Sequence, residues 1–213
     1  MHVFVTGATG YIGSRLIPEL VARGHRVSAL TRQASVQRLA PACRVVFGDA
    51  LDDSSYASQI GAVDALVHLV GVPHPSPAKA EAFRRIDLAS ARAALAAAVE
   101  AGAPHFVYLS VAQPAPVMHA YVAARAEGEA LIRASGIAAS VLRPWYVLGP
   151  GHHWPRLLLP AYYLLERLPG TRDAARRLGL VSVGQMVAAI VRAAESPPSG
   201  VRVWGVPEIR SPG

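Results

Sequence analysis

The chain has 213 residues, of which 52% are hydrophobic, and its formal net charge at pH 7 is +7. That length and apolar fraction suit one globular domain with a sizeable core. The positive charge comes from arginines scattered along the chain, with Lys79 as the only lysine and no basic tail, and this pattern argues against a nucleic-acid-binding protein.

The sequence also bears on where the protein works. Cys43 is the only cysteine, which excludes an internal disulfide and indicates a reducing compartment. The N-terminus enters an apolar strand without the basic region and cleavage site of a secretory signal. The longest apolar stretch, residues 157–165, contains Pro160 and is much shorter than the ~20 residues of a membrane span. We therefore expect a soluble, cytoplasmic protein.

The first predicted element is a short strand, residues 2–6, rich in β-branched and aromatic residues. It turns abruptly into Gly7, Gly10 and Gly13. Gly7 allows a tight turn, Gly10 lets backbone N–H groups approach a ligand, and Gly13 lets a helix over residues 11–23 pack close to the sheet. Unpaired N–H donors and the positive end of the helix dipole meet there, so the turn predicts a pyrophosphate site. A plain structural turn is the alternative.

Strand and helix patterns then alternate along the chain. Further strands are predicted at residues 25–30, 45–47, 64–69, 105–109 and 137–142, with helices at 79–101 and 120–134 and a helix start at 52–54. This alternation specifies a parallel sheet that is covered on both faces. The predicted fold class is therefore α/β, a Rossmann-like doubly wound parallel sheet.

The pattern changes at Pro144. The elements predicted beyond it are a loop at 149–153, a broken helix at 154–168, an amphipathic helix at 182–195 capped by Ser182, and a short strand at 201–204. This part is too small to fold alone. Residues 1–213 are therefore predicted to form one domain, with 144–213 as a short C-terminal extension on the substrate side, over the carboxyl ends of the strands.

The end of the second predicted strand bears on the cofactor. An NAD site there has an acid for the ribose 2′-hydroxyl, whereas an NADP site has a cation for the 2′-phosphate. The strand ends at Thr31 and Arg32 without an acid, and Arg32 can form a charge-assisted, bidentate pair with phosphate. NADP(H) is favoured. Interpreting Arg32 as an ordinary surface arginine leaves NAD(H) open.

Together with four later segments, the glycine turn resembles the extended and atypical short-chain dehydrogenase/reductases, in particular the NAD(P)-binding subgroup of NmrA-like regulators and complex I accessory subunits. The segments are Gly48-Asp49, residues 67–71 (VHLVG), residues 108–110 (YLS), and Tyr121 through Arg143-Pro144. The resemblance covers nearly the whole chain. It implies that Gly7, Thr9, Gly10, Tyr11, Ile12 and Gly13 hold the pyrophosphate, Asp49 and Ala50 meet the adenine, Leu69, Val70 and Gly71 line the cofactor, and Pro144 to Val147 approach the nicotinamide.

The resemblance also implies a catalytic set. In the family a tyrosine exchanges the proton during hydride transfer, a lysine four residues on holds the nicotinamide ribose, and a serine on the preceding strand orients the substrate oxygen. Here Tyr121 and Ser110 are present, but Arg125 replaces the lysine. One helical turn places Tyr121 and Arg125 on the same face. A guanidinium also favours the phenolate form of a phenol, whose unperturbed pKa is ~10.

Two interpretations of Arg125 stay open. Arginine fills nearly every cationic position of this chain, so on the first interpretation the replacement of lysine leaves a working site. On the second, the rigid, forked guanidinium of Arg125 does not preserve the ribose geometry that a lysine gives, and turnover is lost. The predicted function is an NADP(H)-dependent oxidoreductase acting on a small, largely apolar carbonyl or alcohol through Tyr121 and Arg125. The alternative is a non-catalytic NADP(H)-binding sensor or accessory protein.

The remaining candidates concern the surroundings of this site. Trp145, Trp154, Tyr162 and Tyr163 are predicted to wall an apolar pocket or a dimer contact, so both a monomer and a homodimer are open. His152-His153 lacks a third ligand, and no metal is predicted. Glu127 and Glu129 are expected to be solvated or paired with Arg125 or Arg133. His68 is expected to be a satisfied near-core residue.

Overall fold

The computed structural model describes residues 1–150, 167 and 170–212. The His152-His153 pair, the aromatic residues Trp154, Tyr162 and Tyr163, and all but one residue of the helix predicted at 154–168 lie outside the described residues. In the described part, none of the helices combines the length and apolar character needed to cross a membrane.

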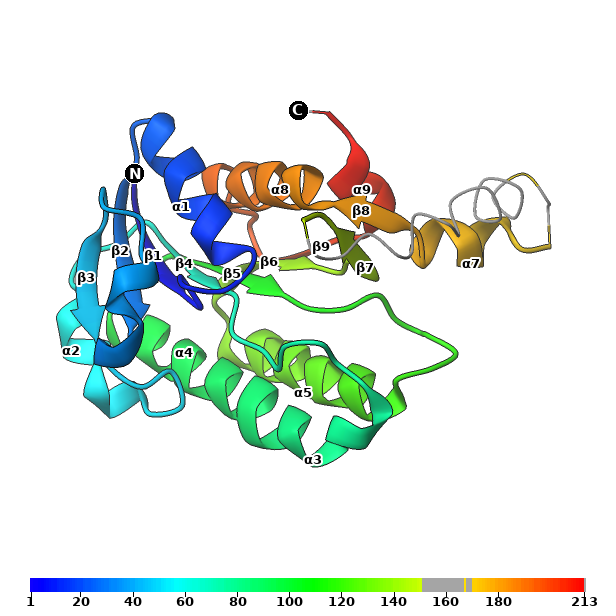
Figure 1. The fold of residues 1–213 in the computed structure, drawn as a ribbon, viewed down its shortest axis with the longest axis horizontal. Coiled ribbons are helices and arrows are strands. Elements are labelled where there is room, and N and C mark those ends of the chain that lie inside the picture. Colours follow the sequence, from blue (N-terminus) through cyan, green and yellow to red (C-terminus); the bar gives the residue numbers. More distant parts are fainter. Residues whose placement is uncertain (151–166, 168–169, 213) are drawn as a thin grey trace.

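Seven parallel strands form one twisted sheet in the order β3-β2-β1-β4-β5-β6-β9 (Figure 1). The strands are β1 His2–Thr6, β2 Arg26–Thr31, β3 Arg44–Phe47, β4 Ala65–His68, β5 His105–Leu109, β6 Ala138–Leu142 and β9 Val201–Trp204. The strand order reverses at β1, with β2 on one side and β4 on the other. A ligand of such a sheet binds outside the carboxyl ends of the strands at this reversal.

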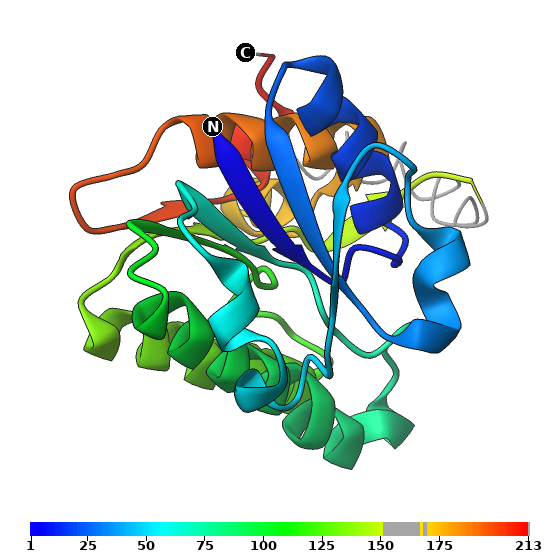
Figure 2. The same ribbon diagram turned by 90° about the vertical axis from the view of Figure 1, so that its left-hand side faces the viewer.

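Helices cover both faces of the sheet, so the predicted doubly wound α/β fold is confirmed. In both views α1 (Gly13–Ala22) and α8 (Val183–Glu195) lie on one face, and α4 (Ala89–Glu100) and α5 (His119–Ser135) lie on the other (Figures 1 and 2). Successive β1 side chains alternate between the two resulting cores, because side chains of a strand point to opposite faces. Val3 and Val5 pack with α1 and α8, whereas Phe4 packs with α4.

The helix predicted at 79–101 is not one regular α-helix. It consists of the 3-10 turn η3 (Pro77–Lys79), the single turn α3 (Ala80–Ala82), the π-helical segment η4 (Phe83–Leu88) and then α4. Widened π turns are often found at functional sites. The η4 segment carries Asp87, whose contacts are described below.

Several short elements complete the described part of the chain. They are η1 (Gln33–Arg38), η2 (Asp53–Ser55), α2 (Ala57–Ile60), β7 (Tyr146–Leu148), α7 (Arg172–Arg177), β8 (Leu180–Ser182) and α9 (Val206–Arg210). β7 and β8 pair in parallel as a separate small sheet. The predicted cap of α8 is confirmed: the Gln185 N–H donates to the Ser182 hydroxyl, and the Ser182 N–H donates to the Gln185 side chain.

Two buried histidines on neighbouring strands should make stability depend on pH. Burial lowers the pKa of His68 to about 3, with the Arg125 charge acting in the same direction, and burial lowers that of His105 to about 4. In the unfolded chain a histidine titrates near pH ~6.5, so as the pH falls the unfolded state takes up protons first. The free energy of unfolding is therefore expected to fall by about 1–2 kcal/mol per histidine between pH 7 and pH 5.

Urea unfolding at pH 7, 6 and 5 measures this loss. The variant His105→Gln removes one titrating ring, so its stability should fall less steeply over the same range. Equal unfolding free energies at pH 7 and pH 5 for the unmodified protein would contradict the prediction.

Candidate functional site

The glycine turn after β1 is built around close backbone contacts. Gly7 has a φ of 74°, a left-handed conformation that glycine adopts without strain, and its carbonyl accepts the Gly10 N–H at 3.0 Å. A Cβ on Gly13 would collide with the Gly7 carbonyl oxygen and come within 2.8 Å of the Ala8 Cα. The first turn of α1 therefore lies directly on the loop, with its N-terminal N–H groups at the carboxyl ends of the strands.

A first cavity of about 370 Å³ lies between this turn and the ends of β2, β3 and β4. Among the predicted cofactor residues it is lined by Gly7, Thr9, Gly10, Arg32, Asp49, Ala50, Leu69, Val70 and Gly71. Its wall also includes Ser35, which sequence reasoning missed because a serine in a polar stretch carries no signal of its own. Three of the segments that carry the resemblance, the glycine turn, Gly48-Asp49 and part of 67–71, are thus adjacent in space.

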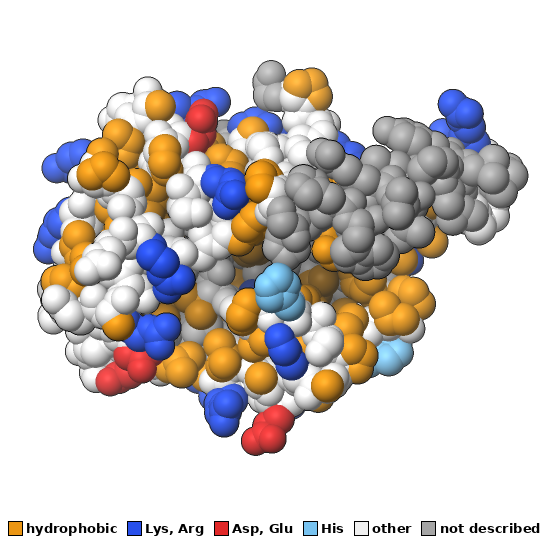
Figure 3. All heavy atoms as spheres, viewed as in Figure 1, with side chains coloured by type: hydrophobic (Ala, Val, Ile, Leu, Met, Phe, Trp, Pro, Cys, Tyr) orange, Lys and Arg blue, Asp and Glu red, His pale blue; other side chains and the backbone are white. Residues whose placement is uncertain are grey.

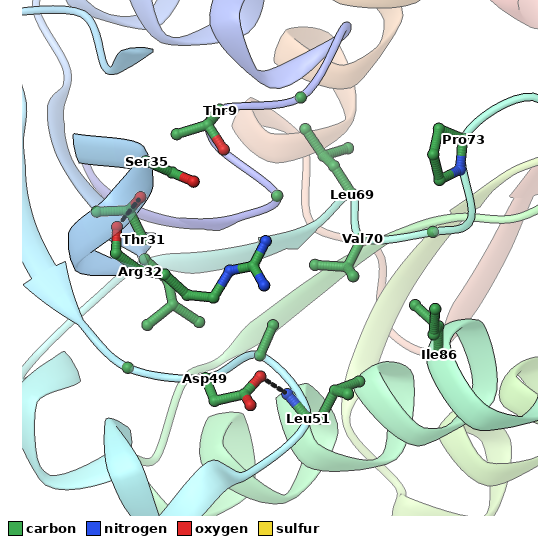
Figure 4. A pocket seen from close by; sticks show the side chains of 16 residues that line it. Thr9, Thr31, Arg32, Ser35, Asp49, Leu51, Leu69, Val70, Pro73 and Ile86 are labelled. Carbon is green, nitrogen blue, oxygen red and sulfur yellow. Dashed lines mark hydrogen bonds between the residues drawn. The ribbon is translucent and has the colours of Figure 1, made fainter. Parts of the chain in front are cut away.

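The Arg32 side chain projects into this cavity from the end of β2, between Asp49 and the Leu69–Val70 segment (Figure 4). Asp49 accepts the Leu51 N–H at 3.0 Å and so bends toward its own loop. The Ser35 hydroxyl is buried and accepts a bond from the Arg38 guanidinium at 3.0 Å, which leaves its own proton for another acceptor. This end of the cavity offers a guanidinium and a hydroxyl to an anion.

A second cavity of about 710 Å³ continues on the other side of the glycine turn and shares Gly7, Gly10, Leu69, Gly71 and Pro73 with the first. It is also lined by Tyr11, Ile12, Gly13, Val72, His74, Pro75, Leu109, Val111, Met118, Tyr121, Arg125, Trp145, Tyr146 and Val147. The two cavities therefore form one groove across the strand ends. Figure 3 shows a hollow in the middle of this face, with basic side chains to its left and hydrophobic ones below.

Tyr121 and Arg125 lie on α5 as the spacing predicted, and both line the second cavity. The Tyr121 ring packs against Phe83, with 5.0 Å between ring centroids, and lies 5.3 Å from the Arg125 guanidinium carbon. This pair can place a phenol hydroxyl and a cation beside one ligand. Of the remaining predicted residues, Pro144 is not part of the cavity wall; its carbonyl accepts the Ala112 N–H at 2.9 Å.

Arg125 is only 3% exposed, and the protein itself occupies its guanidinium. It donates to Asp87 Oδ1 at 2.6 Å, to the Leu109 carbonyl at 2.7 Å and to the Val70 carbonyl at 3.3 Å. A Cβ on Gly71 would collide with Arg125 Nη2, so the guanidinium fills the space that glycine leaves. Burial raises the pKa of Asp87 above its ordinary value, and the adjacent guanidinium and the Val72 N–H oppose that rise.

Asp87 is a residue that sequence reasoning missed. The only available signal was an acid between Ile86 and Leu88 in a largely apolar helix, and nothing in the sequence indicates which cation it meets. Its side chain has no exposed surface. The Asp87–Arg125 pair is therefore a buried ion pair at the edge of the groove.

Ser110 is held by a second buried carboxylate. Its hydroxyl donates to Glu129 Oε1 at 2.7 Å, and Ser110 is not part of the wall of either cavity. Glu129 also accepts from Gln113 at 2.7 Å, from Arg143 and from Arg133. Although burial raises the pKa of Glu129, bonds from Arg143 and Ser110 outweigh that and hold it below its ordinary value. The expected pairing with Arg133 is confirmed.

The other predicted neighbours lie as follows. Glu127 is on the surface, where its Oε2 lies 3.6 Å from Arg84 Nη2 and its Oε1 lies 3.9 Å from Arg92 Nη2. His68 is fully buried, with Nδ1 2.8 Å from the Thr6 hydroxyl, so the expected near-core position is confirmed. Among the described residues, no group of His, Cys, Asp and Glu is arranged to hold a metal ion.

Comparison with known proteins agrees with this geometry. Residues 7–152 match the family model described as NAD(P)H-binding. A 3-diazoavenalumate denitrifying reductase of Streptomyces sp is 35% identical over 94% of this chain and 74% of its own length. A ceramide reductase of Caulobacter vibrioides is 32% identical over 70% of this chain, but the match spans only 47% of that enzyme.

Solved structures of similar shape share the fold at low identity. MoeE5, in complex with UDP-glucose and NAD, has a TM-score of 0.72 at 22% identity, covering 98% of this chain and 79% of that one. The Bordetella bronchiseptica enzyme WbmH, in complex with NAD+, has a TM-score of 0.70 at 22% identity, covering 96% and 75%.

The parallel doubly wound sheet, the glycine turn and the groove across the strand ends define an NAD(P)-binding Rossmann-fold protein. The chain belongs to the family described as NAD(P)H-binding, and its function is of the reductase or dehydrogenase type.

Proposed function

We propose that this protein is an NADP(H)-dependent oxidoreductase that acts on a small, largely apolar carbonyl or alcohol. The observation that carries the proposal is the continuous groove with Arg32 at one end and Tyr121 at the other. The glycine turn supports it. A Cβ at Gly7 or Gly13 would collide with neighbouring backbone, so only glycine fits at these two positions.

The proposed cofactor orientation follows the groove. The 2′-phosphate would meet Arg32 and Ser35, the adenine Asp49 and Ala50, and the pyrophosphate the turn from Gly7 to Gly13. The nicotinamide end would lie in the second cavity, near Leu69, Gly71 and Val147. The bound cofactor would supply or accept a hydride at the substrate carbon.

Tyr121 is the proposed general acid and base. Its phenol would donate a proton to the substrate oxygen during reduction and take one from it during oxidation. Arg125 would act on that phenol through its fixed position 5.3 Å from the ring, as a cation whose charge is balanced by Asp87. That Ser110 orients the substrate stays a prediction, and it requires the hydroxyl to exchange its bond to Glu129 for one to the substrate.

The second cavity supports an apolar substrate. Besides Arg125, its described wall includes the apolar and aromatic side chains of Val111, Met118, Trp145 and Tyr146. Trp145 and Tyr146 come from the part of the chain after Pro144. We propose that residues 144–213 complete the substrate side as part of the same domain.

The hydride acceptor need not be a carbonyl. The Streptomyces relative is named for the reduction of a diazo compound, so diazo compounds belong in a substrate screen. Hydride addition to an aryl diazonium group releases N₂ and leaves a C–H bond, and this balance needs no proton from Tyr121. A carbonyl substrate and an aryl diazonium substrate therefore differ in whether they depend on that phenol, whereas a neutral diazo compound needs a proton as well as the hydride.

A second candidate function is a non-catalytic NADP(H)-binding sensor or accessory protein. The observation in its favour is that Arg125 and Ser110, two members of the proposed catalytic set, already bond to buried carboxylates of this chain. Such a protein would bind the cofactor as proposed here but would not need the Tyr121 hydroxyl.

The test is a titration of the protein with NADPH and with NADH, followed by quenching of tryptophan fluorescence. NADPH is expected to bind more tightly, and Arg32→Ala should weaken NADPH about 10- to 100-fold while leaving NADH within about twofold, because a charge-assisted phosphate bond is lost. Arg26→Ala, at the exposed opposite end of β2, is the matched control and should change neither affinity.

Each other outcome has a definite meaning. If both nucleotides bind equally and Arg32→Ala affects neither, the NADP preference is wrong. If neither nucleotide binds, the glycine turn is only architecture, and both candidate functions fall together.

A further inference from the structure

The segment from Val70 to His74 is a wall of both cavities: Gly71 and Pro73 line both, Val70 lines the first, and Val72 and His74 line the second. It follows β4 and lies outside both sheet and helix, and side chains bond its backbone. The Val70 carbonyl accepts from Arg125 at 3.3 Å, and the Val72 N–H donates to Asp87 Oδ2 at 3.0 Å. Lys79 Nζ donates to the Pro73 carbonyl at 2.7 Å and to the His74 carbonyl at 3.0 Å.

Asp87 joins the two halves of this arrangement. One of its oxygens bonds Arg125 and the other bonds the wall itself, so this buried carboxylate links α5 to the Val70–His74 segment, in addition to the direct bond from Arg125 to the Val70 carbonyl. Because both oxygens are used and the side chain is completely buried, the carboxylate has little freedom to move. The wall is thereby tied to α5, the helix that carries Tyr121, and Tyr121 lines the same second cavity.

Lys79 holds the other end of the wall. His74 has a φ of 49°, a left-handed conformation that costs a non-glycine residue free energy and persists where surrounding contacts impose it. The two Lys79 bonds close the loop around this residue. His74 also lines the second cavity, so the contacts that fix its backbone also shape the cavity.

We infer that Asp87 and Lys79 are positioning residues, which fix the Val70–His74 wall against the nicotinamide end of the cofactor. The inference rests on the proposed function, because it requires the cofactor to lie in the groove. Neither side chain is assigned contact with the cofactor or the substrate. Their effect is exerted through the backbone that they hold.

The test compares two ligands, NADPH and 2′-phospho-ADP-ribose, which lacks the nicotinamide. Lys79→Met removes both bonds to the wall at a partly exposed position, so the fold is not at risk. The Kd of NADPH is expected to rise about 3- to 10-fold, as for one or two lost hydrogen bonds. That of 2′-phospho-ADP-ribose should rise clearly less, because of the wall only Val70, Gly71 and Pro73 line the first cavity. Lys79→Arg keeps donors at this position and should restore most of the NADPH affinity.

Asp87→Asn should change the two affinities in the same selective way and by a larger factor, of about 10 or more. Arg125 and the Val72 N–H donate to different carboxylate oxygens, and the amide nitrogen that replaces one of these oxygens cannot accept a bond. Arg84→Met is the matched control, because Arg84 is a surface cation of the same η4 segment as Asp87 and lies outside both cavities. It should alter neither affinity. If Asp87→Asn does not fold, the Lys79 variants decide alone.

Three results would overturn the inference. Unchanged NADPH affinity in Lys79→Met would show that the wall needs no such anchor, and equal weakening of both ligands would show a general structural effect. Failure of Lys79→Arg to recover affinity would mean that the donors are not what matters. If the unmodified protein binds neither ligand, the proposed function itself fails. Measuring the unmodified protein therefore distinguishes failure of the proposed function from failure of the inference about Asp87 and Lys79.

Discussion

Replacing Tyr121 by phenylalanine is expected to lower kcat for a carbonyl or alcohol substrate by about 10²- to 10⁴-fold, the usual contribution of a positioned general acid or base. The Kd of NADPH should stay within about twofold, since the ring remains packed against Phe83. NADPH oxidation with a panel of apolar carbonyl and diazo compounds supplies the rate, and fluorescence quenching supplies the Kd.

The matched control is Tyr56→Phe. Tyr56 is fully buried outside both cavities, and its hydroxyl has no hydrogen-bond partner among the described residues, so removing that hydroxyl should leave both kcat and cofactor affinity unchanged. A Tyr121→Phe variant with full turnover of a carbonyl would contradict the proposed acid–base role. Full turnover of an aryl diazonium compound alone would instead identify a reaction that takes hydride without a proton from the protein.

Replacing Arg125 by methionine is expected to lower the free energy of unfolding by about 3–5 kcal/mol, because it leaves the Asp87 carboxylate buried without its counter-ion. The double variant Asp87→Asn/Arg125→Met should recover part of this loss, since no buried charge remains and the carbonyl of the introduced side-chain amide can still accept the Val72 N–H. Urea unfolding of both single variants and the double variant completes the cycle.

The control for that cycle is Arg92→Met. Arg92 is exposed and lies 3.9 Å from Glu127, and an ion pair of this kind contributes about 0–1 kcal/mol. If the three Asp87 and Arg125 variants showed strictly additive losses, the two residues would not act as a unit. The account of a charge-balanced cation beside Tyr121 would then be wrong.

The parts of the fold that could be predicted from sequence are those that local pattern determines. Apolar runs of strand length and the glycine turn identified the parallel sheet and its ligand edge, because each signal lies within a few neighbouring residues. The β7 and β8 strands were missed. They have only three residues each, too few for any periodicity to show.

The candidate site was only partly predictable for a different reason. The spacing of Tyr121 and Arg125 follows from one helical turn and is found as expected. What Arg125 and Ser110 bond to depends on Asp87 and Glu129, which are 38 and 19 residues away in the chain. Such pairings follow from how the helices pack on the sheet, and no local pattern encodes them.

The position of α8 has a consequence for how the chain folds during synthesis. This helix packs beside α1 and fills the core that Val5 and Leu16 help to form, although α1 ends at Ala22 and α8 begins only at Val183. While the ribosome is still making the middle of the chain, that apolar face of the nascent sheet is covered by α1 but not yet by α8. The opposite face can be closed earlier, by α4, so the two cores are completed at different times and the late one is the more exposed to misassociation.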